Sequence, residues 1–302
     1  MGGSMPGKTL KVAVLMGGFS SEKDISLSSG RGVEKALKNL GYVTKAIIVC
    51  EDLSKLVTDL KRFNPDVVFN ALHGRFGEDG CIQGILNWLK IPYTHSGMLA
   101  SSIGMNKEMT RKIAMQVKVP VARGGIKTKA EFEKMKLPLV VKPNDEGSSI
   151  GVSLILNESD RKKIKWPKNK ELLVEEYIPG RELSVAVLDG KVLGTLELIP
   201  KKGWYDFKNK YKSGAVKHLI PAPVSPAIER ELCRYAEKVH NALGCRGISR
   251  SDFRLNKSRI VFLEINTSPG MTPTSLVPDI AKLKNLTYEK LVEKLVRGAR
   301  CD

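Results

Sequence analysis

Residues 262–270 have the sequence FLEINTSPG, a short strand pattern that ends in a Pro/Gly turn. Side chains alternate between the two faces of a strand, so we expect Glu264 and Asn266 on one face. Leu263 and Ile265 are expected on the opposite face, toward the core. Two oxygen donors aimed at one point suit a hard cation such as Mg2+, especially one that carries nucleotide phosphates.

A second alternating run, residues 250–255 (RSDFRL), precedes this strand. It offers Asp252 as a third oxygen ligand, and Arg250 adds fixed positive charge on the same face. The alternative is a pair of edge strands with solvated charges. An Asn that follows an apolar run is unfavourable in a strand without a function. The pattern therefore predicts a metal site formed by Asp252, Glu264 and Asn266.

The composition is typical of a globular enzyme. The chain has 302 residues, enough for two or three small domains, with 42% hydrophobic and 27% charged residues. No apolar run approaches the roughly 20 residues needed to span a bilayer, and residues 1–5 (MGGSM) lack the pattern of a signal peptide. The five scattered cysteines never show metal-pair spacing, which indicates reduced thiols in a cytoplasmic protein.

The net charge of +18 is compatible with a nucleic-acid, anionic-membrane or anionic-substrate partner. Lys and Arg are spread along the chain, and the densest run, residues 161–170 (RKKIKWPKNK), is typical of a surface connector. One Trp in that run does not make a platform for base stacking. We therefore expect no nucleic acid and no membrane as partner.

The first part of the chain alternates strand and helix patterns. Strands are predicted at residues 11–16 (KVAVLM), 46–49, 66–70 (DVVFN) and 91–94 (IPYT), and helices from Ser20 or Ser21 and at 84–90. This alternation favours a parallel, doubly wound sheet that ends near residue 95.

The remainder predicts α+β units. A helical segment from Met98 carries Lys107, and the later elements are strands at 137–142, 151–156 and 172–177, a polar loop at 201–217, a helix at 227–242 and the acid-bearing strands. We predict an N-terminal domain of residues 1–95, a small central domain of residues 96–179 and a C-terminal domain of residues 180–302.

Two segments of the central part suit a nucleotide. Residues 144–151 (NDEGSSIG) link two strands, and Gly-rich backbone with Ser hydroxyls can donate to phosphate oxygens beside Lys142. A mobile hairpin loop has the same composition, and the loop matches neither the P-loop nor the dinucleotide fingerprint. Residues 175–178 (EEYI) offer strand backbone that can form hydrogen bonds with adenine, and the nearby Glu182 offers a carboxylate for the ribose hydroxyls. The alternative is that this segment is an acidic hinge between two units.

Taken together, these segments resemble the D-alanine–D-alanine ligases of the ATP-grasp superfamily over nearly the whole chain. The similar segments, in order, are residues 17–22 (GGFSSE), 71–74 (ALHG), 105–107 (MNK), 141–143 (VKP) with 146–149 (EGSS), 205–206 (YD) with 210–211 (KY), 250–252 (RSD) and 264–276 (EINTSPGMTPTSL). The last segment is highly specific. For the other segments, the resemblance rests on their order and spacing along the chain. The resemblance implies an α/β and α+β chain with the ATP-grasp fold and an N-terminal doubly wound parallel-sheet domain.

The resemblance also implies a nucleotide site for ATP. It assigns the phosphates to Lys107, Lys142 and Lys210, the adenine to Glu175, Glu176 and Ile178 with Leu263 beneath the ring, and the ribose to Glu182. Asp252, Glu264 and Asn266 would hold two Mg2+ ions, or Mn2+ in their place, which neutralise charge as the γ-phosphoryl group moves.

For the first substrate, the resemblance has Glu22 bind the ammonium group of a D-alanine, with His73 nearby. Ser148 and Tyr211 would join Glu22 in a hydrogen-bonded group that ties loops over the site. From the residues alone, a Glu in the first turn of a helix also complements the helix dipole, and a lone His is usually structural.

For the second substrate, the resemblance has Ser275 and Leu276 bind the carboxylate of another D-alanine. Arg250 and the N–H of Gly270 would stabilise the oxyanion of the tetrahedral intermediate. The implied reaction joins two D-alanines through a D-alanyl phosphate and gives D-alanyl-D-alanine, ADP and phosphate for peptidoglycan precursor synthesis and cell shape. The resemblance further implies a cytoplasmic homodimer.

Other interpretations stay open. One is a ligase that joins D-alanine to a hydroxy acid such as D-lactate, against which Tyr211 argues because such relatives typically change this loop. A second is an ATP-grasp enzyme for another carboxylate and amine, and a third is a basic binding protein. The sequence departs from the family pattern at His95, where a small residue is usual, at Asn106, where Asp is common, and at Pro273-Thr274, where the family varies.

Replacing Tyr211 with Phe removes one hydroxyl from the implied covering group. We expect ATP affinity to stay nearly unchanged while ATP hydrolysis without dipeptide formation rises, because water reaches the activated substrate. The measurement is the ratio of phosphate released to dipeptide formed. An unchanged ratio would contradict the covering role.

Overall fold

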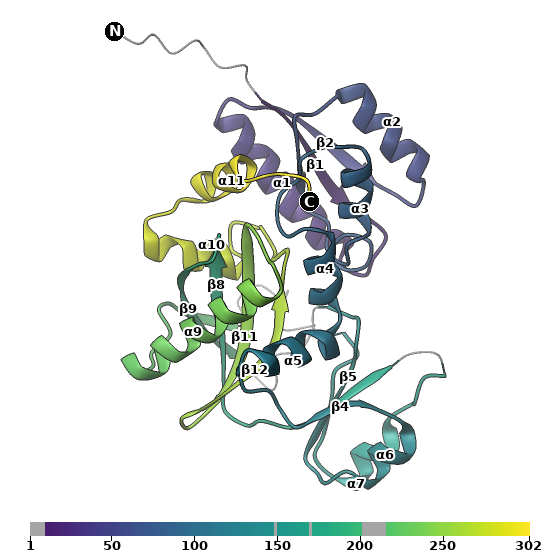
Figure 1. Ribbon diagram of the computed structural model, residues 1–302, viewed down its shortest axis with the longest axis vertical. Coiled ribbons are helices and arrows are strands. Elements are labelled where there is room, and N and C mark those ends of the chain that lie inside the picture. Colours follow the sequence, from purple (N-terminus) through teal and green to yellow (C-terminus); the bar gives the residue numbers. More distant parts are fainter. Residues whose placement is uncertain (1–9, 148–149, 169–170, 201–215) are drawn as a thin grey trace.

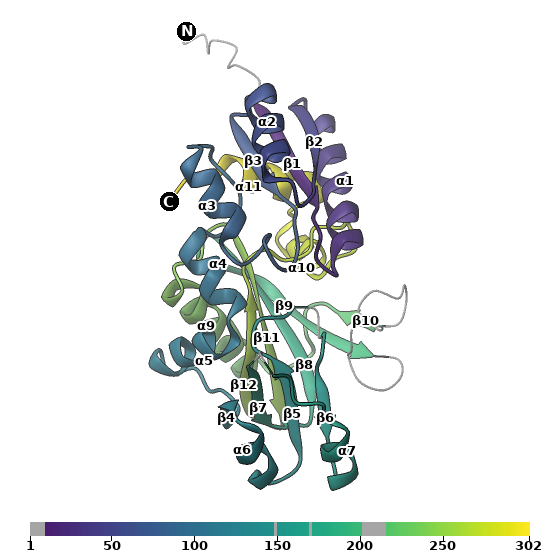
Figure 2. The same cartoon turned by 90° about the vertical axis from the view of Figure 1, so that its right-hand side faces the viewer.

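The computed structural model describes residues 10–147, 150–168, 171–200 and 216–302, which form three β-sheets (Figure 1). In the view of Figure 2 the parallel sheet lies at the top, the five-stranded sheet in the middle and the four-stranded sheet at the bottom. Among the described residues, no helix is long and apolar enough to cross a bilayer.

The N-terminal sheet is parallel, as predicted, with the order β2-β1-β3. Its strands are β1 (Lys11–Gly17), β2 (Val43–Val49) and β3 (Val67–Asn70). The surrounding helices are α1 (Lys23–Asn39), α2 (Leu53–Phe63), α3 (Cys81–Trp88) and α11 (Tyr288–Arg297). Val14 belongs to the core shared with α1 and α11, while Leu15 belongs to the core shared with α2 and α3. Helices thus cover both faces, which confirms the doubly wound arrangement.

One predicted strand of this sheet is absent. At residues 91–94 only Tyr93 pairs with the sheet, through an isolated parallel bridge to Val68. Pro92 has no N–H to donate to a ladder, which limits pairing at this edge. The first helix also begins at Lys23, later than the Ser20 or Ser21 expected.

The central sheet is antiparallel with the order β4-β7-β5-β6. Its strands are β4 (Gly124–Lys127), β5 (Leu139–Pro143), β6 (Ser153–Ile155) and β7 (Leu172–Glu176), and its helices are α6 (Lys129–Lys134) and α7 (Glu158–Lys163). A separate apolar core, including Phe132 and Val141, holds this unit together. The predicted return strand 151–156 is shortened to three residues.

The largest sheet is antiparallel with the order β10-β9-β8-β11-β12. Its strands are β8 (Arg181–Leu188), β9 (Lys191–Pro200), β10 (Val216–Leu219), β11 (Ile248–Asn256) and β12 (Arg259–Asn266). The neighbouring helices are α4 (Met98–Met105), α5 (Lys107–Gln116), α9 (Pro226–Ala242), α10 (Leu276–Ala281) and the short η1 (Lys282–Lys284). One face packs on α9 and α5, and the other packs on α10.

The last helix belongs to the N-terminal core. Leu291 and Leu295 of α11 share a buried cluster with Val33 and Leu37 of α1. Beyond α11, the Asp302 side chain accepts hydrogen bonds from Tyr93 and from the N–H of Met98, the first residue of α4. The end of the chain therefore ties the N-terminal unit to the helices that lead into the central sheet.

His95 occupies a backbone conformation that favours glycine, with φ at +70°. Its side chain is buried and meets Phe69 edge-on, with ring centroids 5.2 Å apart. The Nε of Arg246 donates to the His95 carbonyl at 3.0 Å. The departure at this position thus keeps the backbone geometry suited to a small residue and adds an imidazole to the core.

Burial lowers the pKa of His95 to about 3 and that of His240 to about 4. Both rings stay neutral in the folded protein at a pH where the unfolded chain binds protons, because an ordinary His titrates near ~6.5. The unfolded state therefore gains stability as the pH falls through this window, and the free energy of unfolding drops.

Replacing His95 with Gln should flatten this pH dependence. The slope of the free energy of unfolding against pH should decrease by at most ~1.4 kcal/mol per pH unit between pH ~4 and ~6.5. The reason is that the folded and unfolded states then differ by one bound proton fewer. Urea unfolding across this range measures the slope, and the Gln variant of His240 provides the matched comparison. Identical slopes in the unaltered protein and both variants would contradict the assignment.

Candidate active site

A cleft opens between the central sheet and the largest sheet, with about 790 Å³ of empty space that includes open solvent. It gathers most of the predicted nucleotide residues, together with two predicted metal ligands: Lys107, Lys142, Glu175, Glu176, Ile178, Glu182, Leu263, Asp252 and Glu264. Residues far apart in the chain therefore converge on one cleft. Lys210, with Ser148 and Tyr211, lies outside the described residues.

Two lysines supply positive charge to this cleft. Lys142 Nζ lies 2.7 Å from Glu175 Oε2, and Lys107 Nζ lies 3.7 Å from Glu264 Oε2. Lys107 also donates to the carbonyl of Glu146. Both lysines are mostly buried, so their charges are little screened by water and are well suited to phosphate oxygens.

The two neighbouring glutamates of β7 have different surroundings. The buried Glu175 is held by Lys142 on one oxygen and by Arg111 on the other. Glu176 accepts from the main chain of Arg123 and from the Arg259 guanidinium. Partial burial opposes ionisation of Glu176, but these hydrogen bonds lower its pKa overall.

The strand pair β11–β12 brings the acids together. Asp252 lies directly opposite Glu264, and Arg250 lies opposite Asn266, so all four are on one face. Arg250 donates to both carboxylate oxygens of Asp252 at 2.9 and 2.8 Å. A Ser184 hydroxyl adds a third hydrogen bond to this carboxylate at 2.6 Å.

The pairing shifts register between Asp252 and Phe253, and this corrects one expectation. Phe253 pairs with Phe262 and Asp252 pairs with Glu264, so Leu263 is an extra residue in β12. Leu263 therefore lines the cleft beside Glu264 and does not point into the core, whereas Ile265 is buried as expected. The bulge gives the cleft an apolar side chain and a carboxylate from adjacent positions.

The predicted metal ligands form a set of two carboxylates and one amide. The described residues contain no group of three or more His, Cys, Asp or Glu that could hold a metal, so a site here depends on Asn266 as a ligand. Asn266 Oδ1 accepts from the N–H of Ser268 at 2.9 Å, and an amide oxygen has a second lone pair. An all-oxygen donor set of this kind fits Mg2+.

Glu22 is buried close to Gly147, the residue that follows Glu146 of the cleft. It is the N-cap of α1 and not part of its first turn, and its side chain makes no capping hydrogen bond. A Cβ at Gly74 would lie 2.9 Å from Glu22 Oε2, and a Cβ at Gly147 would lie 3.1 Å from it. Glycine at these two positions lets main chain from two loops approach the carboxylate closely.

His73 is a member of a buried network beside Glu22. Its Nδ1 lies 2.8 Å from Glu78 Oε1, and its Nε2 lies 3.2 Å from Ser29 Oγ. Ser29 also accepts from the N–H of Met271 at 3.2 Å. Burial opposes protonation of His73, but the hydrogen bond to Glu78 raises its pKa overall, while burial raises the pKa of Glu78.

The loop after β12 carries the remaining predicted residues. Ser275 is the N-cap of α10, and Leu276 is its first residue. The Ser275 hydroxyl contacts the Thr272 hydroxyl at 2.7 Å, and a Cβ at Gly270 would lie 3.2 Å from it. The variable pair at 273–274 thus lies within a turn whose ends are joined by hydrogen bonds.

Asn106 performs the capping role expected of an acid at its position. Its side chain accepts from the N–H of Met109 at 3.0 Å and so caps α5, which begins with Lys107. Asn144 Nδ2 donates to the same oxygen at 3.2 Å. Asn106 therefore still caps α5, the helix that begins with Lys107, and ties it to the loop after β5.

Two arginines in or beside the cleft were not predicted from the sequence. Arg254 lines it and continues the alternation of Arg250 and Asp252 along β11, a signal that was available. Arg111 pairs with Glu175 and lies four residues after Lys107, on the same face of α5. Only the contact between α5 and β7 reveals its partner.

Comparison with known proteins supports the resemblance. The family described as "D-ala D-ala ligase C-terminus" matches residues 122–297, and that described as "D-ala D-ala ligase N-terminus" matches residues 50–96. A D-alanine–D-alanine ligase of Paramagnetospirillum magneticum is 46% identical over 97% of this chain and 99% of its own. One of Rhodospirillum rubrum is 43% identical over 97% and 99%.

Solved structures agree. A D-alanine–D-alanine ligase of Bacillus anthracis has a TM-score of 0.84 at 30% identity, covering 96% of this chain and 97% of its own. The same enzyme complexed with ATP has a TM-score of 0.81 at 28% identity, covering 96% and 97%. A D-Ala:D-Ser ligase of Enterococcus faecalis has a TM-score of 0.80 at 26% identity, covering 96% and 99%. These likenesses confirm the predicted ATP-grasp fold. The chain belongs to the D-alanine–D-alanine ligase family.

Proposed function

We propose that this protein uses ATP to join two D-alanine molecules into D-alanyl-D-alanine, releasing ADP and phosphate, for peptidoglycan precursor synthesis in the cytoplasm. One observation carries the proposal. The register between β11 and β12 sets Arg250, Asp252 and Glu264 on one face of the strand pair, and the two carboxylates line a cleft that also contains two buried lysines. The family membership and the full-length relatives support the same activity.

ATP binds in this cleft with its adenine at β7 and its phosphates at the lysines. Ile178 and the two glutamates of β7 line the adenine end, with Leu263 beneath the ring and Glu182 at the ribose. Lys107, Lys142 and Lys210 hold the phosphates. Two Mg2+ ions on Asp252, Glu264 and Asn266, with Mn2+ as a substitute, would neutralise phosphate charge during transfer.

The first D-alanine binds beside Glu22, whose carboxylate takes the ammonium group. This orients the substrate carboxylate toward the γ-phosphate, and one of its oxygens forms the new P–O bond as ADP leaves. Lys107 of the cleft is linked to Glu22 through one loop, because it donates to the carbonyl of Glu146 and the next residue, Gly147, approaches Glu22. His73, fixed by Glu78, lies near this substrate.

The second D-alanine binds with its carboxylate at Ser275 and Leu276. Its deprotonated amine attacks the carbonyl carbon of D-alanyl phosphate, and collapse of the tetrahedral intermediate expels phosphate. Arg250 and the N–H of Gly270 stabilise the oxyanion. Asp252 already orients the Arg250 guanidinium through two hydrogen bonds, so little reorganisation is needed.

Water must be excluded because the acyl phosphate is readily hydrolysed. Ser148 and Tyr211 join Glu22 in the group that closes the site. We further propose the domain division at residues 1–95, 96–179 and 180–302, with α11 packing back on the first unit, and assembly as a homodimer.

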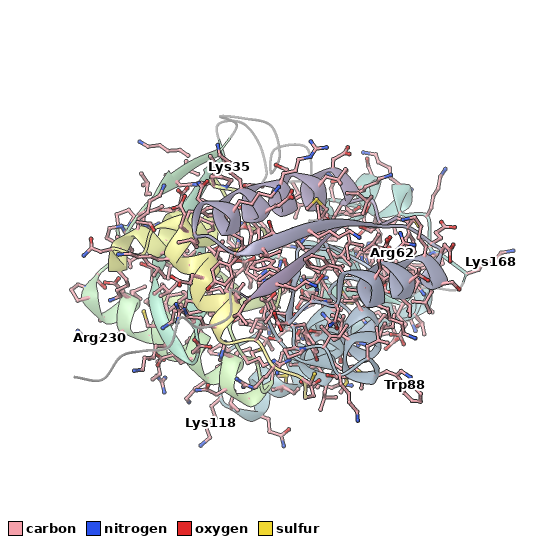
Figure 3. All side chains as sticks on the ribbon, turned by 90° about the horizontal axis from the view of Figure 1, so that it is seen from above. Lys35, Arg62, Trp88, Lys118, Lys168 and Arg230 are labelled. Atoms are coloured by element: carbon pink, nitrogen blue, oxygen red, sulfur yellow. The ribbon has the colours of Figure 1, made fainter. Side chains whose placement is uncertain are left out.

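The high positive charge has no nucleic-acid role in this proposal. Exposed Lys35, Arg62, Lys118, Lys168 and Arg230 project from different sides of the molecule in Figure 3. These cations come from separate elements, so they do not mark one basic stripe of the kind that follows a nucleic-acid backbone.

Measuring ADP release with Mg2+ and ATP tests the function. We expect release that depends on D-alanine, with D-alanyl-D-alanine identified by mass. L-alanine is the stereochemical control, and D-alanine with D-lactate or D-serine tests the alternative second substrates. A folded protein that binds ATP but gives no product with any alanine would contradict the proposal.

Replacing Glu264 with Gln tests the metal assignment. We expect kcat to fall by about two orders of magnitude or more with little change in stability, because one of the ligands that neutralise phosphate charge is lost. Mg2+-dependent ADP binding by calorimetry should weaken in parallel. Glu231→Gln, on the exposed face of α9, is the matched control and should behave as the unaltered protein. An unchanged kcat in the Glu264 variant would rule out this ligand.

A further inference from the structure

Arg254 has no role in the proposed reaction, yet it lines the nucleotide cleft. It extends from β11 on the same face as Asp252, and its cross-strand partner on β8 is Glu182. Arg254 NH1 lies 3.2 Å from Glu182 Oε2, and each side chain is only 13% exposed. The pair is therefore largely shielded from water.

Two further contacts confine the guanidinium. Its Nε donates to the carbonyl of Ile178 at 3.1 Å, and its central carbon lies 5.9 Å from the centre of the Tyr177 ring. Tyr177, Ile178 and Glu182 all line the same cleft. Each partner of Arg254 in these contacts therefore belongs to the nucleotide site.

A purely structural pair between β8 and β11 is the simpler explanation. The ladder that joins these strands already extends from Ile248↔Leu188 to Leu255↔Arg181, so the sheet does not depend on one side-chain pair. Arg254 also reaches beyond β8 to the segment between β7 and β8. A structural pair needs neither this second contact nor a place in the cleft.

We propose that Arg254 is a positioning residue of the nucleotide site, holding the Glu182 carboxylate for the ribose hydroxyls and the Ile178 carbonyl for the adenine edge of the pocket. This deepens the proposed function and rests on its ATP site. Arg254 donates to Oε2 of Glu182, and a carboxylate has about four lone-pair sites, so this group can also accept from a ribose hydroxyl. The planar fork of arginine allows one side chain to bind the carboxylate and the carbonyl together.

The test measures recognition of ribose apart from overall affinity. Binding of ADP and of 2′,3′-dideoxy-ADP is measured by calorimetry, and the ratio of the two dissociation constants reports the ribose hydroxyls. In the unaltered protein we expect ADP to bind about tenfold more tightly, as a hydrogen bond to a charged carboxylate implies. Arg254→Met should weaken ADP binding by about tenfold, weaken dideoxy-ADP binding much less, and bring the ratio toward one.

Three other variants sharpen the test. Arg254→Lys keeps the charge but not the fork and should give an intermediate ratio. Glu182→Gln should lower the ratio as Arg254→Met does, and combining the two should lower it no further, because they act through one contact. Arg234→Met breaks an exposed Arg–Glu pair on α9 and should leave the ratio unchanged.

The outcomes distinguish failure of this inference from failure of the proposed ATP site. A wild-type ratio in Arg254→Met overturns the positioning role, even if overall affinity falls. If Arg254→Met does not fold, the same result in Arg254→Lys overturns it. A ratio near one in the unaltered protein, which would mean no recognition of the ribose hydroxyls, also overturns the positioning role. Failure of the unaltered protein to bind ADP overturns both the ATP site and this inference.

Discussion

The antiparallel register of β11 on β12 is the constraint on which the site depends. It sets Asp252 opposite Glu264, and Arg250 opposite Asn266, so that charges from two sequence segments share one face. The bulge at Leu263 adds an apolar side chain to the same cleft without moving the acids off that face. A slip of one residue would turn each of these side chains toward the other side of the sheet. The relative positions of these side chains are therefore fixed by main-chain hydrogen bonds between buried strands.

Around this strand pair, the buried charges of the described cleft are organised as partners. Lys142 is held by Glu175, Lys107 approaches Glu264, and Arg250 is held by Asp252. Burial makes an unpaired charge costly, and the folded protein places opposite charges together, which also orients these side chains. The same ion pairs thus contribute to the stability of the fold and hold charged side chains in place for a ligand.

Much of this could be predicted from local pattern. Alternating or continuous apolar runs located β1, β11 and β12, and their chemistry identified Glu264 and Asp252 as neighbours on a face. Alternation alone placed Leu263 toward the core, which was wrong, because a bulge depends on how the partner strand pairs and leaves no mark in simple alternation. The partner of Arg111 and the approach of Gly147 to Glu22 arise only when distant segments meet. His95 shows the converse: its departure was visible in the sequence, but its buried, neutral ring was not.

The return of α11 to the first sheet has a consequence for synthesis. Leu291 and Leu295 complete the apolar cluster that α1 presents through Val33 and Leu37. A chain leaving the ribosome makes α1 long before α11, so this face stays open to solvent until α11 has been added. The parallel sheet therefore cannot mature as an independent early unit. Until α11 is made, the apolar surface of α1 remains exposed, which is the kind of surface that makes partly folded chains prone to aggregation.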